Sequence, residues 1–363
     1  MPRRKSEHLG EVTAPSGSLF VVDMGYLEMW CHDQKPVMPP GILSDEGTKN
    51  ANAGADFRID GRDAEKCGRH WGRQWHPRFH FDIPKHGIGH VRKGFAEFVA
   101  EHGYEAKLTM LRGRVTHRQR IADALEYGKG MGQVFFQGLE GFVISGVPTG
   151  TKMRVTGERM GGRDRAVSER WRWVDLEVRP GRKVVSSAPA GRVFVDRARL
   201  MFADIDALKE WKHDEPIDGK ADLVFWGRDA EAAARAVKAP RLPDMDGGTL
   251  YGWDNLPDAE ARRKGGIVWQ AKQKNQWLLG LDYRPHSHHW QIMEQVRRRA
   301  TESGIAEVGG ATMCGFMTSW GDGLYPVIVE RDRGDEVVRV RLQLGDDDRV
   351  KQYHDMMERA KAR

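Results

Sequence analysis

The clearest alternation of hydrophobic and polar positions lies near the end of the chain. Between positions 338 and 344, valine or leucine at every even position alternates with arginine or glutamine at every odd position. A period of two is typical of a β-strand that buries one face and exposes the other to water. We therefore predict a strand here, in a sheet of mainly antiparallel pairing.

A second pattern joins a strand to a helix. Residues 222–226 are largely apolar and predict a strand, Gly227 predicts the turn, and residues 228–238 predict a helix. Five alanines favour this helix, acidic side chains stand near its N-terminal end, and Pro240 ends it. The stretch therefore predicts a β-turn-α unit.

The beginning of this unit occurs twice in the chain. Residues 55–65 (ADFRIDGRDAE) and 221–231 (ADLVFWGRDAE) are identical at seven of eleven positions and lie 166 residues apart. Shorter matches follow in the same order, among them 17–21 with 191–195, 30–33 with 211–214, 82–84 with 254–257, and 92–94 with 263–265. The offsets between paired segments run from 166 to 181, as loop insertions in two copies of one unit would produce. We interpret the chain as a tandem duplication.

The predicted fold is α+β, with two homologous domains related by a pseudo-twofold axis, each a mainly antiparallel sheet with short helices. A chain of 363 residues is long enough for two such cores. The predicted parts are a basic N-terminal arm (1–16), repeat domain 1 (17–180), a linker (181–190), repeat domain 2 (191–345) and a C-terminal helix (346–363). Within repeat domain 1, the polar, glycine-containing residues 39–54 predict a long loop.

Composition narrows the class of protein. Hydrophobic residues make up 39% and charged residues 30% of the chain, which favours a folded protein over a disordered one. The 58 basic and 52 acidic residues give a net charge of +6, an excess too small to favour nucleic-acid binding over a mixed, solvated surface. Three cysteines, no secretory signal pattern and no apolar run of membrane length predict a cytoplasmic protein without a membrane partner.

The strongest candidate for chemistry is a histidine-rich segment of the first copy. Cys67 with His70, and His76 with His80, form two pairs whose spacing places two donors within reach of one metal ion, and Asp82 is a further candidate ligand. The paired spacing follows that of zinc ligands, so zinc is one candidate ion, and the sequence leaves the cofactor unidentified. The second copy lacks this segment, so a polar, aromatic surface loop stays open as the alternative.

Other recurring histidines favour structural roles. A His-Asp pair at 32–33 recurs at 213–214, and an arginine and a histidine at 112 and 117 recur at 284 and 289. No serine or cysteine nucleophile stands in a recognisable elbow, and the glycine-rich residues 128–132 follow a predicted helix where a phosphate-binding loop would precede one. Basic residues 3–5 and the 12 tryptophans leave contact with nucleic acid as a weaker alternative.

The stretch Ser319 to Val327 (SWGDGLYPV) carries a family resemblance. Together with residues 330–332 and the strand at 337–344, it resembles the closing signature of a bacterial family of unknown function whose members end in a Gly-Asp-Gly-x-Tyr-Pro-Val hairpin. The resemblance covers only the C-terminal part of the chain. It implies a β-rich binding domain, in some members encoded near toxin-immunity or defence genes, and it supplies no catalytic residue.

These patterns together predict a non-enzymatic binding or assembly protein. A protein partner or self-assembly is the expected mode of action, and bacterial defence or toxin immunity is the setting that the resemblance implies. The alternative is a metal-dependent hydrolase or nuclease that uses the histidine-rich segment. We expect the ligand site in a groove between the two copies, because ligands commonly bind where domains meet.

Overall fold

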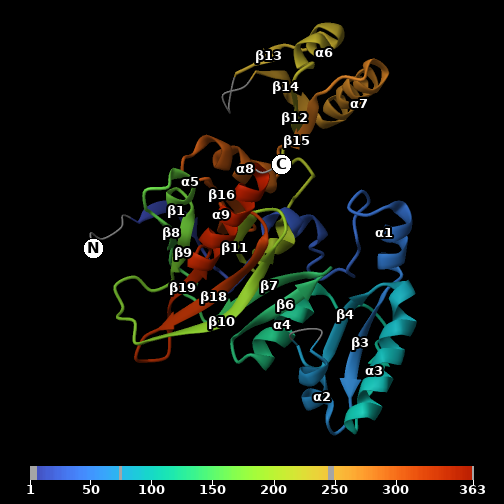
Figure 1. The fold of residues 1–363 in the computed structure, drawn as a ribbon, viewed down its shortest axis with the longest axis vertical. Coiled ribbons are helices and arrows are strands. Elements are labelled where there is room, and N and C mark those ends of the chain that lie inside the picture. Colours follow the sequence, from blue (N-terminus) through green and yellow to red (C-terminus); the bar gives the residue numbers. More distant parts are fainter. Residues whose placement is uncertain (1–5, 73–75, 244–248, 362–363) are drawn as a thin grey trace.

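The computed structural model describes residues 6–72, 76–243 and 249–361. Its fold is α+β, as predicted, with mainly antiparallel sheets and short helices. A body of two large sheets carries two smaller lobes, which we name the first lobe (residues 55–110) and the second lobe (residues 220–285) (Figure 1). The fold positions these lobes at different places on the body.

Two six-stranded sheets form the body. Sheet I has the strand order β1-β8-β9-β19-β18-β10, and sheet II has the order β16-β17-β11-β2-β7-β6, so both contain strands of both predicted repeat domains. The strands of sheet I are β1 (Glu7–Val12), β8 (Met153–Arg159), β9 (Trp171–Glu177), β10 (Ser186–Val195), β18 (Gly323–Arg331) and β19 (Val337–Gln343). Those of sheet II are β2 (Ser18–Asp23), β6 (Met131–Phe136), β7 (Leu139–Ser145), β11 (Arg199–Asp204), β16 (Ser303–Val308) and β17 (Ala311–Met317).

The two halves of the chain meet at the centre of each sheet. In sheet II, β2 pairs with β11 so that Val21 lies opposite Phe202, and in sheet I, β9 pairs with β19 so that Asp175 lies opposite Arg341. In each sheet, three strands of the first half lie on one side of this junction and three strands of the second half lie on the other. Counted outward from the junction, β9, β8 and β1 correspond to β19, β18 and β10 in sheet I, and β2, β7 and β6 correspond to β11, β17 and β16 in sheet II. The pseudo-twofold relation itself stays a prediction.

Two buried aspartates also tie the halves together. Asp23, at the end of β2, accepts the backbone N–H groups of Asp196 and Arg197 at 2.8 and 2.9 Å. Asp204, at the end of β11, accepts the backbone N–H of Ser16 at 2.8 Å. Each carboxylate also accepts backbone N–H groups of its own half, so these bonds connect the two halves at the ends of the central strands.

The core consists of two apolar layers, one on each face of sheet II. Leu19 and Val21 point toward sheet I and pack in a cluster with its buried strands. Phe20 points to the opposite face, where the cluster includes residues of α4 (His117–Tyr127) and α8 (His288–Arg298). Because sheet II is covered on both faces, its strands are apolar over most of their length, unlike the alternating β19.

The two lobes share an order of elements. The first lobe has the sheet β4-β3-β5, and the second has the sheet β13-β14-β12-β15. The first lobe consists of β3 (Ala55–Asp60), α2 (Ala64–Trp71), β4 (Phe79–Ile83), η2 (Lys85–Gly87), α3 (Ile88–His102) and β5 (Lys107–Met110). The second consists of β12 (Lys220–Trp226), α6 (Ala230–Val237), β13 (Arg241–Leu242), β14 (Leu250–Pro257), α7 (Asp258–Asn275) and β15 (Gly280–Pro285). The helix that follows each lobe, α4 or α8, returns the chain to sheet II.

The repeated Gly-Arg-Asp-Ala-Glu motif has matching surroundings in the two lobes. Gly61 and Gly227 both adopt a positive φ, +125° and +119°, and both lie against the chain that enters the last strand of the lobe. Asp63 accepts the backbone N–H of Glu105 at 2.9 Å, and Asp229 accepts that of Leu278 at 2.7 Å. The motif therefore forms the same turn, held by the same kind of side-chain bond, in both lobes.

One of the shorter sequence matches does not join equivalent strands. Residues 17–21 lie in β2 of sheet II and its preceding turn, whereas residues 191–195 lie in β10 of sheet I. The partner of β2 at the junction is β11. Short apolar strands resemble one another because both sheets bury them, so a match of this length carries little positional information.

Other segments are more regular than the sequence suggests. The loop predicted at 39–54 contains α1 (Asp45–Asn52), whose first turn is capped by the Ser44 side chain at 3.1 Å from the Gly47 N–H. The predicted basic arm includes β1, which pairs with β8, and the predicted linker includes the start of β10. The remaining elements are η1 (Met24–Met29), α5 (Arg165–Ser168), η3 (Ala207–Glu210) and α9 (Asp347–Lys361).

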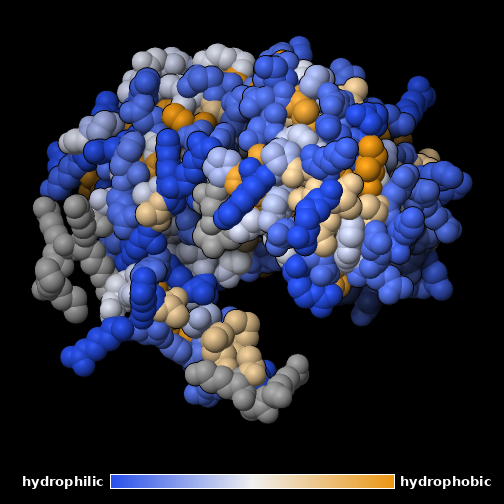
Figure 2. Space-filling model, turned by 90° about the horizontal axis from the view of Figure 1, so that it is seen from above, coloured by the Kyte–Doolittle hydropathy of each residue, from blue (hydrophilic) through white to orange (hydrophobic). Residues whose placement is uncertain are grey.

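The surface is mixed in character. Hydrophilic residues cover most of the face seen in Figure 2, and hydrophobic ones lie in small groups. Within the described parts of the chain, none of the helices combines the length and the apolar character needed to cross a bilayer.

Candidate ligand-binding site

The five residues predicted to bind a metal ion lie in different surroundings. The Cys67 thiol is buried on α2 against Ile59 and Phe95, and burial raises its pKa. His70 is exposed on the same helix, where its Nδ1 lies 3.0 Å from the hydroxyl of Tyr104. Cys67 therefore behaves as an apolar core residue, and His70 takes part in an aromatic surface cluster.

His76 and His80 are also held by protein contacts. His76 packs against the rings of Phe79 and Tyr127, both at 4.8 Å between centroids, and burial lowers its pKa to about 4. His80 lies buried on β4. The His76 ring thus belongs to the packing between the first lobe and α4, and His80 belongs to a strand of the first lobe.

The described residues contain one group of three side chains with metal-ligand spacing, and it is elsewhere. It consists of Glu28, His213 and Asp214, so Cys67, His70, His76, His80 and Asp82 do not form such a group. Arg197 pairs with Glu28 at 2.5 Å, and its positive charge opposes a cation at this position. Neither set of residues therefore presents a favourable metal site.

Asp82 belongs to a buried ion network between the first lobe and α4. Arg120 donates to both of its carboxylate oxygens at 2.5 and 2.9 Å, and Arg114 donates to Asp82 and, at 3.0 Å, to Asp56. The four side chains are at most 9% exposed. Burial acts to raise the pKa of Asp82, but the hydrogen bonds and charges of the two arginines lower it below its usual value.

Backbone groups complete this network. Asp56 accepts the N–H of Asp82 at 2.8 Å and that of Val115 at 2.7 Å, and Asp82 accepts the N–H of Gln137 at 2.7 Å. Each buried carboxylate therefore has both arginine and backbone donors, as a buried charge requires. The network fills the space between the strands of the first lobe and the N-terminal half of α4.

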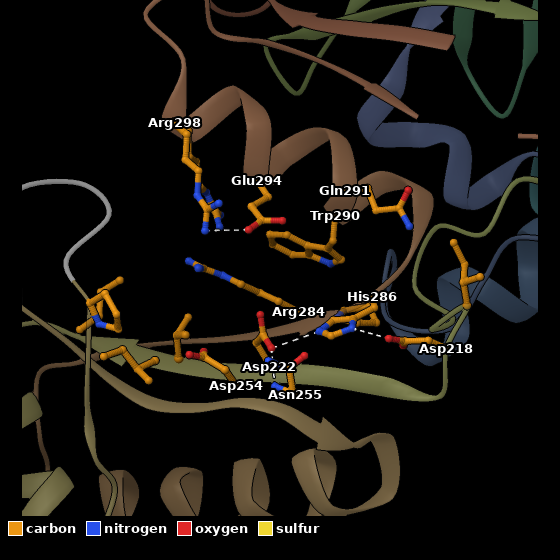
Figure 3. A pocket seen from close by; sticks show the side chains of 17 residues that line it. Asp218, Asp222, Asp254, Asn255, Arg284, His286, Trp290, Gln291, Glu294 and Arg298 are labelled. Atoms are coloured by element: carbon orange, nitrogen blue, oxygen red, sulfur yellow. Dashed lines mark hydrogen bonds and ion pairs between the residues drawn. The ribbon is translucent and has the colours of Figure 1, made fainter. Parts of the chain in front are cut away.

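The corresponding space in the second lobe is open. A cavity of about 460 Å³ lies between the strands of the second lobe and α8 (Figure 3). Its walls combine apolar, acidic and basic side chains. The lining residues are Ile217, Asp218, Asp222, Val224, Leu242, Pro243, Leu250, Asp254, Asn255, Arg284, Pro285, His286, Trp290, Gln291, Glu294, Arg297 and Arg298.

Strand contacts identify the second-lobe counterparts of the two network aspartates. Asp222 accepts the N–H of Asn255 at 2.8 Å, as Asp56 accepts the N–H of Asp82. Asp82 and Asn255 both have a positive φ, +57° and +56°, at a bulge in the same strand pair. Asp222 therefore takes the place of Asp56, and the neutral Asn255 takes the place of Asp82.

Helix contacts identify the counterpart of Arg120. His117 at the start of α4 accepts the N–H of Cys31 at 3.1 Å, and His288 at the start of α8 accepts the N–H of Lys212 at 2.9 Å. These contacts pair His117 with His288, one residue before the His289 that the sequence comparison paired with it. Three residues further along each helix stand Arg120 and Gln291, so the second half has a glutamine where the first has its network arginine.

The strand side of the cavity is acidic. Asp222, with its side chain 31% exposed, lies 3.2 Å from Nε2 of His286, whose Nδ1 lies 2.8 Å from Asp218. Burial acts to lower the pKa of His286, but the two carboxylates raise it above its usual value. Burial, and then the neighbouring charge of Asp222, raise the pKa of Asp254. Asp254 has no hydrogen bond or ion pair with residues 6–72, 76–243 or 249–361.

The helix side of the cavity is basic and aromatic. Arg284 comes from β15 on the strand side, pairs with Asp282 at 2.8 Å and extends toward Trp290 of the helix (Figure 3). Arg297 lies 5.0 Å from the Trp290 ring, on the same helix as the ion pair of Arg298 with Glu294. The cavity can therefore bind a polar ligand that presents positive charge to the strands.

The sequence comparison contained part of this site without revealing it. The match of residues 55–65 with 221–231 aligned Asp56 with Asp222, and the match near Pro84 and Pro257 brought Asn255 close to Asp82. The change from Arg120 to Gln291 was hidden because the histidines before them were paired one position out of register. A pairing of the two helix N-caps, Thr116 and Ser287, would have revealed it.

Comparison with protein-family models, with curated proteins and with solved structures finds no match to this chain. The resemblance of residues 319–327 to a bacterial family therefore stays a prediction.

Proposed function

We propose that this protein is a non-enzymatic binding protein, built from a tandem α+β repeat, whose ligand site is the cavity between the second lobe and α8. The observation that carries this proposal is the contrast between equivalent places in the two lobes. In the first lobe, Arg114 and Arg120 cover Asp56 and Asp82, and the hollow of about 550 Å³ beside α4 is lined by other residues. In the second lobe, a cavity of about 460 Å³ is lined by Asp222 and Asp254 themselves. That volume falls within the about 300–1,000 Å³ typical of ligand pockets.

This site differs from the groove between the copies that the sequence favoured. The cavity lies within the second half of the chain, because its lining residues fall between 217 and 298. A cytoplasmic location, and a role in bacterial defence or toxin immunity, belong to the same proposal and depend on the sequence alone. The metal-dependent hydrolase is not proposed further, since its five candidate ligands have other partners or surroundings.

A pocket-filling variant tests the proposal. Gln291 is exposed on α8 and lines the cavity, so Gln291→Trp places an indole there without disturbing the core. Gln119→Trp, at an exposed position of α4, is the matched control. We expect a thermal-shift screen of small polar compounds to find ligands that stabilise the wild type and the control but not Gln291→Trp. Ligands that stabilise all three proteins equally, or a screen without any stabilising compound, would contradict the proposal.

A further inference from the structure

The first lobe shows what its carboxylates bind. Asp56 and Asp82 lie side by side at a strand bulge, and the guanidinium of Arg120 contacts both of them, at 3.5 and 2.9 Å for the same nitrogen. Arg114 contacts both as well. The place between these strands and the following helix is therefore shaped for a planar group that donates several N–H bonds to two carboxylates at once.

The second lobe keeps an acidic wall but supplies no such group from its own chain. Asp222 stands where Asp56 stands, and Asp254 adds a second carboxylate one residue before Asn255. Arg284 is close enough to lower the pKa of Asp254 through its charge, but its ion pair is with Asp282. Within the described residues, no arginine or lysine forms an ion pair with Asp222 or Asp254.

We propose that the second-lobe cavity binds a guanidinium group of a ligand, placed between Asp222 and Asp254. This inference rests on the proposed function, which it makes specific. The ligand provides in the second lobe what Arg120 provides in the first. The chemical class is an alkyl guanidinium, either in a small molecule such as arginine or in an arginine side chain of a polypeptide.

The rest of the lining fits the stem of such a ligand. Val224, Leu242 and Leu250 give the cavity an apolar wall next to its acidic one, and an arginine side chain combines three methylene groups with its charged end. The basic residues Arg297 and Arg298 on α8 lie across the cavity from the strands (Figure 3 labels Arg298). A carboxylate at the far end of the ligand, as in free arginine, would face them.

Isothermal titration calorimetry separates guanidinium from other chemistry. We expect arginine, agmatine or a pentapeptide with a central arginine to bind, and citrulline to bind at least about tenfold more weakly, since it has a similar shape but no charge. Binding of free arginine or agmatine identifies a small molecule as the source, and binding of the peptide alone identifies a polypeptide. Equal binding of citrulline and arginine would overturn the inference.

Two variants locate the binding. Asp254→Asn removes an exposed carboxylate without a hydrogen bond among the described residues, so it should fold normally and bind arginine about 10- to 100-fold more weakly. Asp123→Asn is the control, because Asp123 lines a hollow of about 550 Å³ next to the first lobe. An unchanged affinity in Asp254→Asn, or an equal loss in Asp123→Asn, would overturn the inference.

A third variant supplies the guanidinium from the chain. Gln291→Arg places an arginine where the first half has Arg120, so we expect it to abolish arginine binding and to raise the melting temperature. Gln119→Arg on α4 should change neither. If the screen with Gln291→Trp finds a pocket ligand without a guanidinium while arginine does not bind, the proposed function stands and this inference falls. The absence of any pocket ligand overturns both.

Discussion

The two lobes have the same arrangement of strands and following helix, but the side chains that lie between them differ. In the first, Asp56 is fully buried under Arg114 and Arg120, and the hollow next to α4 does not reach it. In the second, Asp222 is 31% exposed beside an open cavity. The difference lies in the side chains, because the strand bulge and its backbone bond are the same. The first half has Asp82 and Arg120 where the second has Asn255 and Gln291. The binding site that we propose therefore depends on the absence from the second lobe of side chains that are present in the first.

Replacement of Arg120 in the first half is expected to have the largest effect on stability. Arg120→Gln gives α4 the residue that α8 has, but it leaves two buried carboxylates with Arg114 as their remaining cationic partner. Loss of one partner from a buried ion network costs about 3–5 kcal/mol. We expect the free energy of unfolding, measured by urea denaturation, to fall by about this amount.

The matched change in the second half should have little effect. Gln291 is exposed, so Gln291→Ala should alter the free energy of unfolding by less than about 0.5 kcal/mol. If Arg120→Gln costs as little as Gln291→Ala, the first-lobe network does not stabilise the fold and the contrast between the lobes loses its physical basis.

The turn glycines give the next largest effect. Both Gly61 and Gly227 have a positive φ, which alone costs a substituted alanine about 1–3 kcal/mol. A Cβ on Gly61 would lie 2.2 Å from the carbonyl oxygen of Glu105, whereas one on Gly227 would lie 3.0 Å from that of Leu278. We therefore expect Gly61→Ala to destabilise the protein more than Gly227→Ala does.

Helical glycines provide the control for this pair. A Cβ added to Gly89 in α3 or to Gly266 in α7 would meet no atom within 4 Å, so alanine there should be neutral or stabilising by up to about 1 kcal/mol. Equal losses of melting temperature for Gly61→Ala and Gly227→Ala would mean that the two turns are equally tight, against the closer approach of the backbone at Gly61.

The sequence predicted the α+β class and the turn because these depend on local patterns. Alternation at 338–344 reports a sheet with one wet face, and the motif around Gly227 combines a strand, a positive-φ glycine and an alanine-rich helix. Such signals need no knowledge of distant contacts. The pairing of β2 with β11 depends instead on which apolar strands meet in space, and their sequences do not specify it.

The site was harder to predict for the same reason. Histidines close together in sequence suggested a metal centre, yet Cys67 and His70 lie on α2 while His80 and Asp82 lie on β4, with different partners. The carboxylates that matter for the proposal come from β12 and β14 and are completed by α8. Only the tertiary arrangement shows that Arg120 fills in one lobe the space that Gln291 leaves open in the other.

The smallest expected effect is a difference in pH dependence between two histidines, one from each half of the chain. His117 of the first half is buried and its pKa is lowered to about 3, so it should stay neutral between pH 5 and 8. His286 of the second half has a raised pKa, because Asp218 and Asp222 outweigh its partial burial. We expect NMR titration of the ring protons to show His286 charging with a pKa above 6.5 and His117 not charging at all.

The sign of the linked stability follows from the raised pKa of His286. The contribution of His286 to the free energy of unfolding is fully present below its unfolded-state pKa of about 6.5. This contribution is lost as the pH rises through the higher folded-state pKa. Because the pair is partly exposed, the change should stay below about 1 kcal/mol. Asp218→Asn should move the His286 pKa down and reduce this change, whereas Asp123→Asn should not. A His286 pKa at or below 6.5 would show that its contacts with Asp218 and Asp222 do not persist in solution. The acidic wall of the second-lobe cavity would then lack its support.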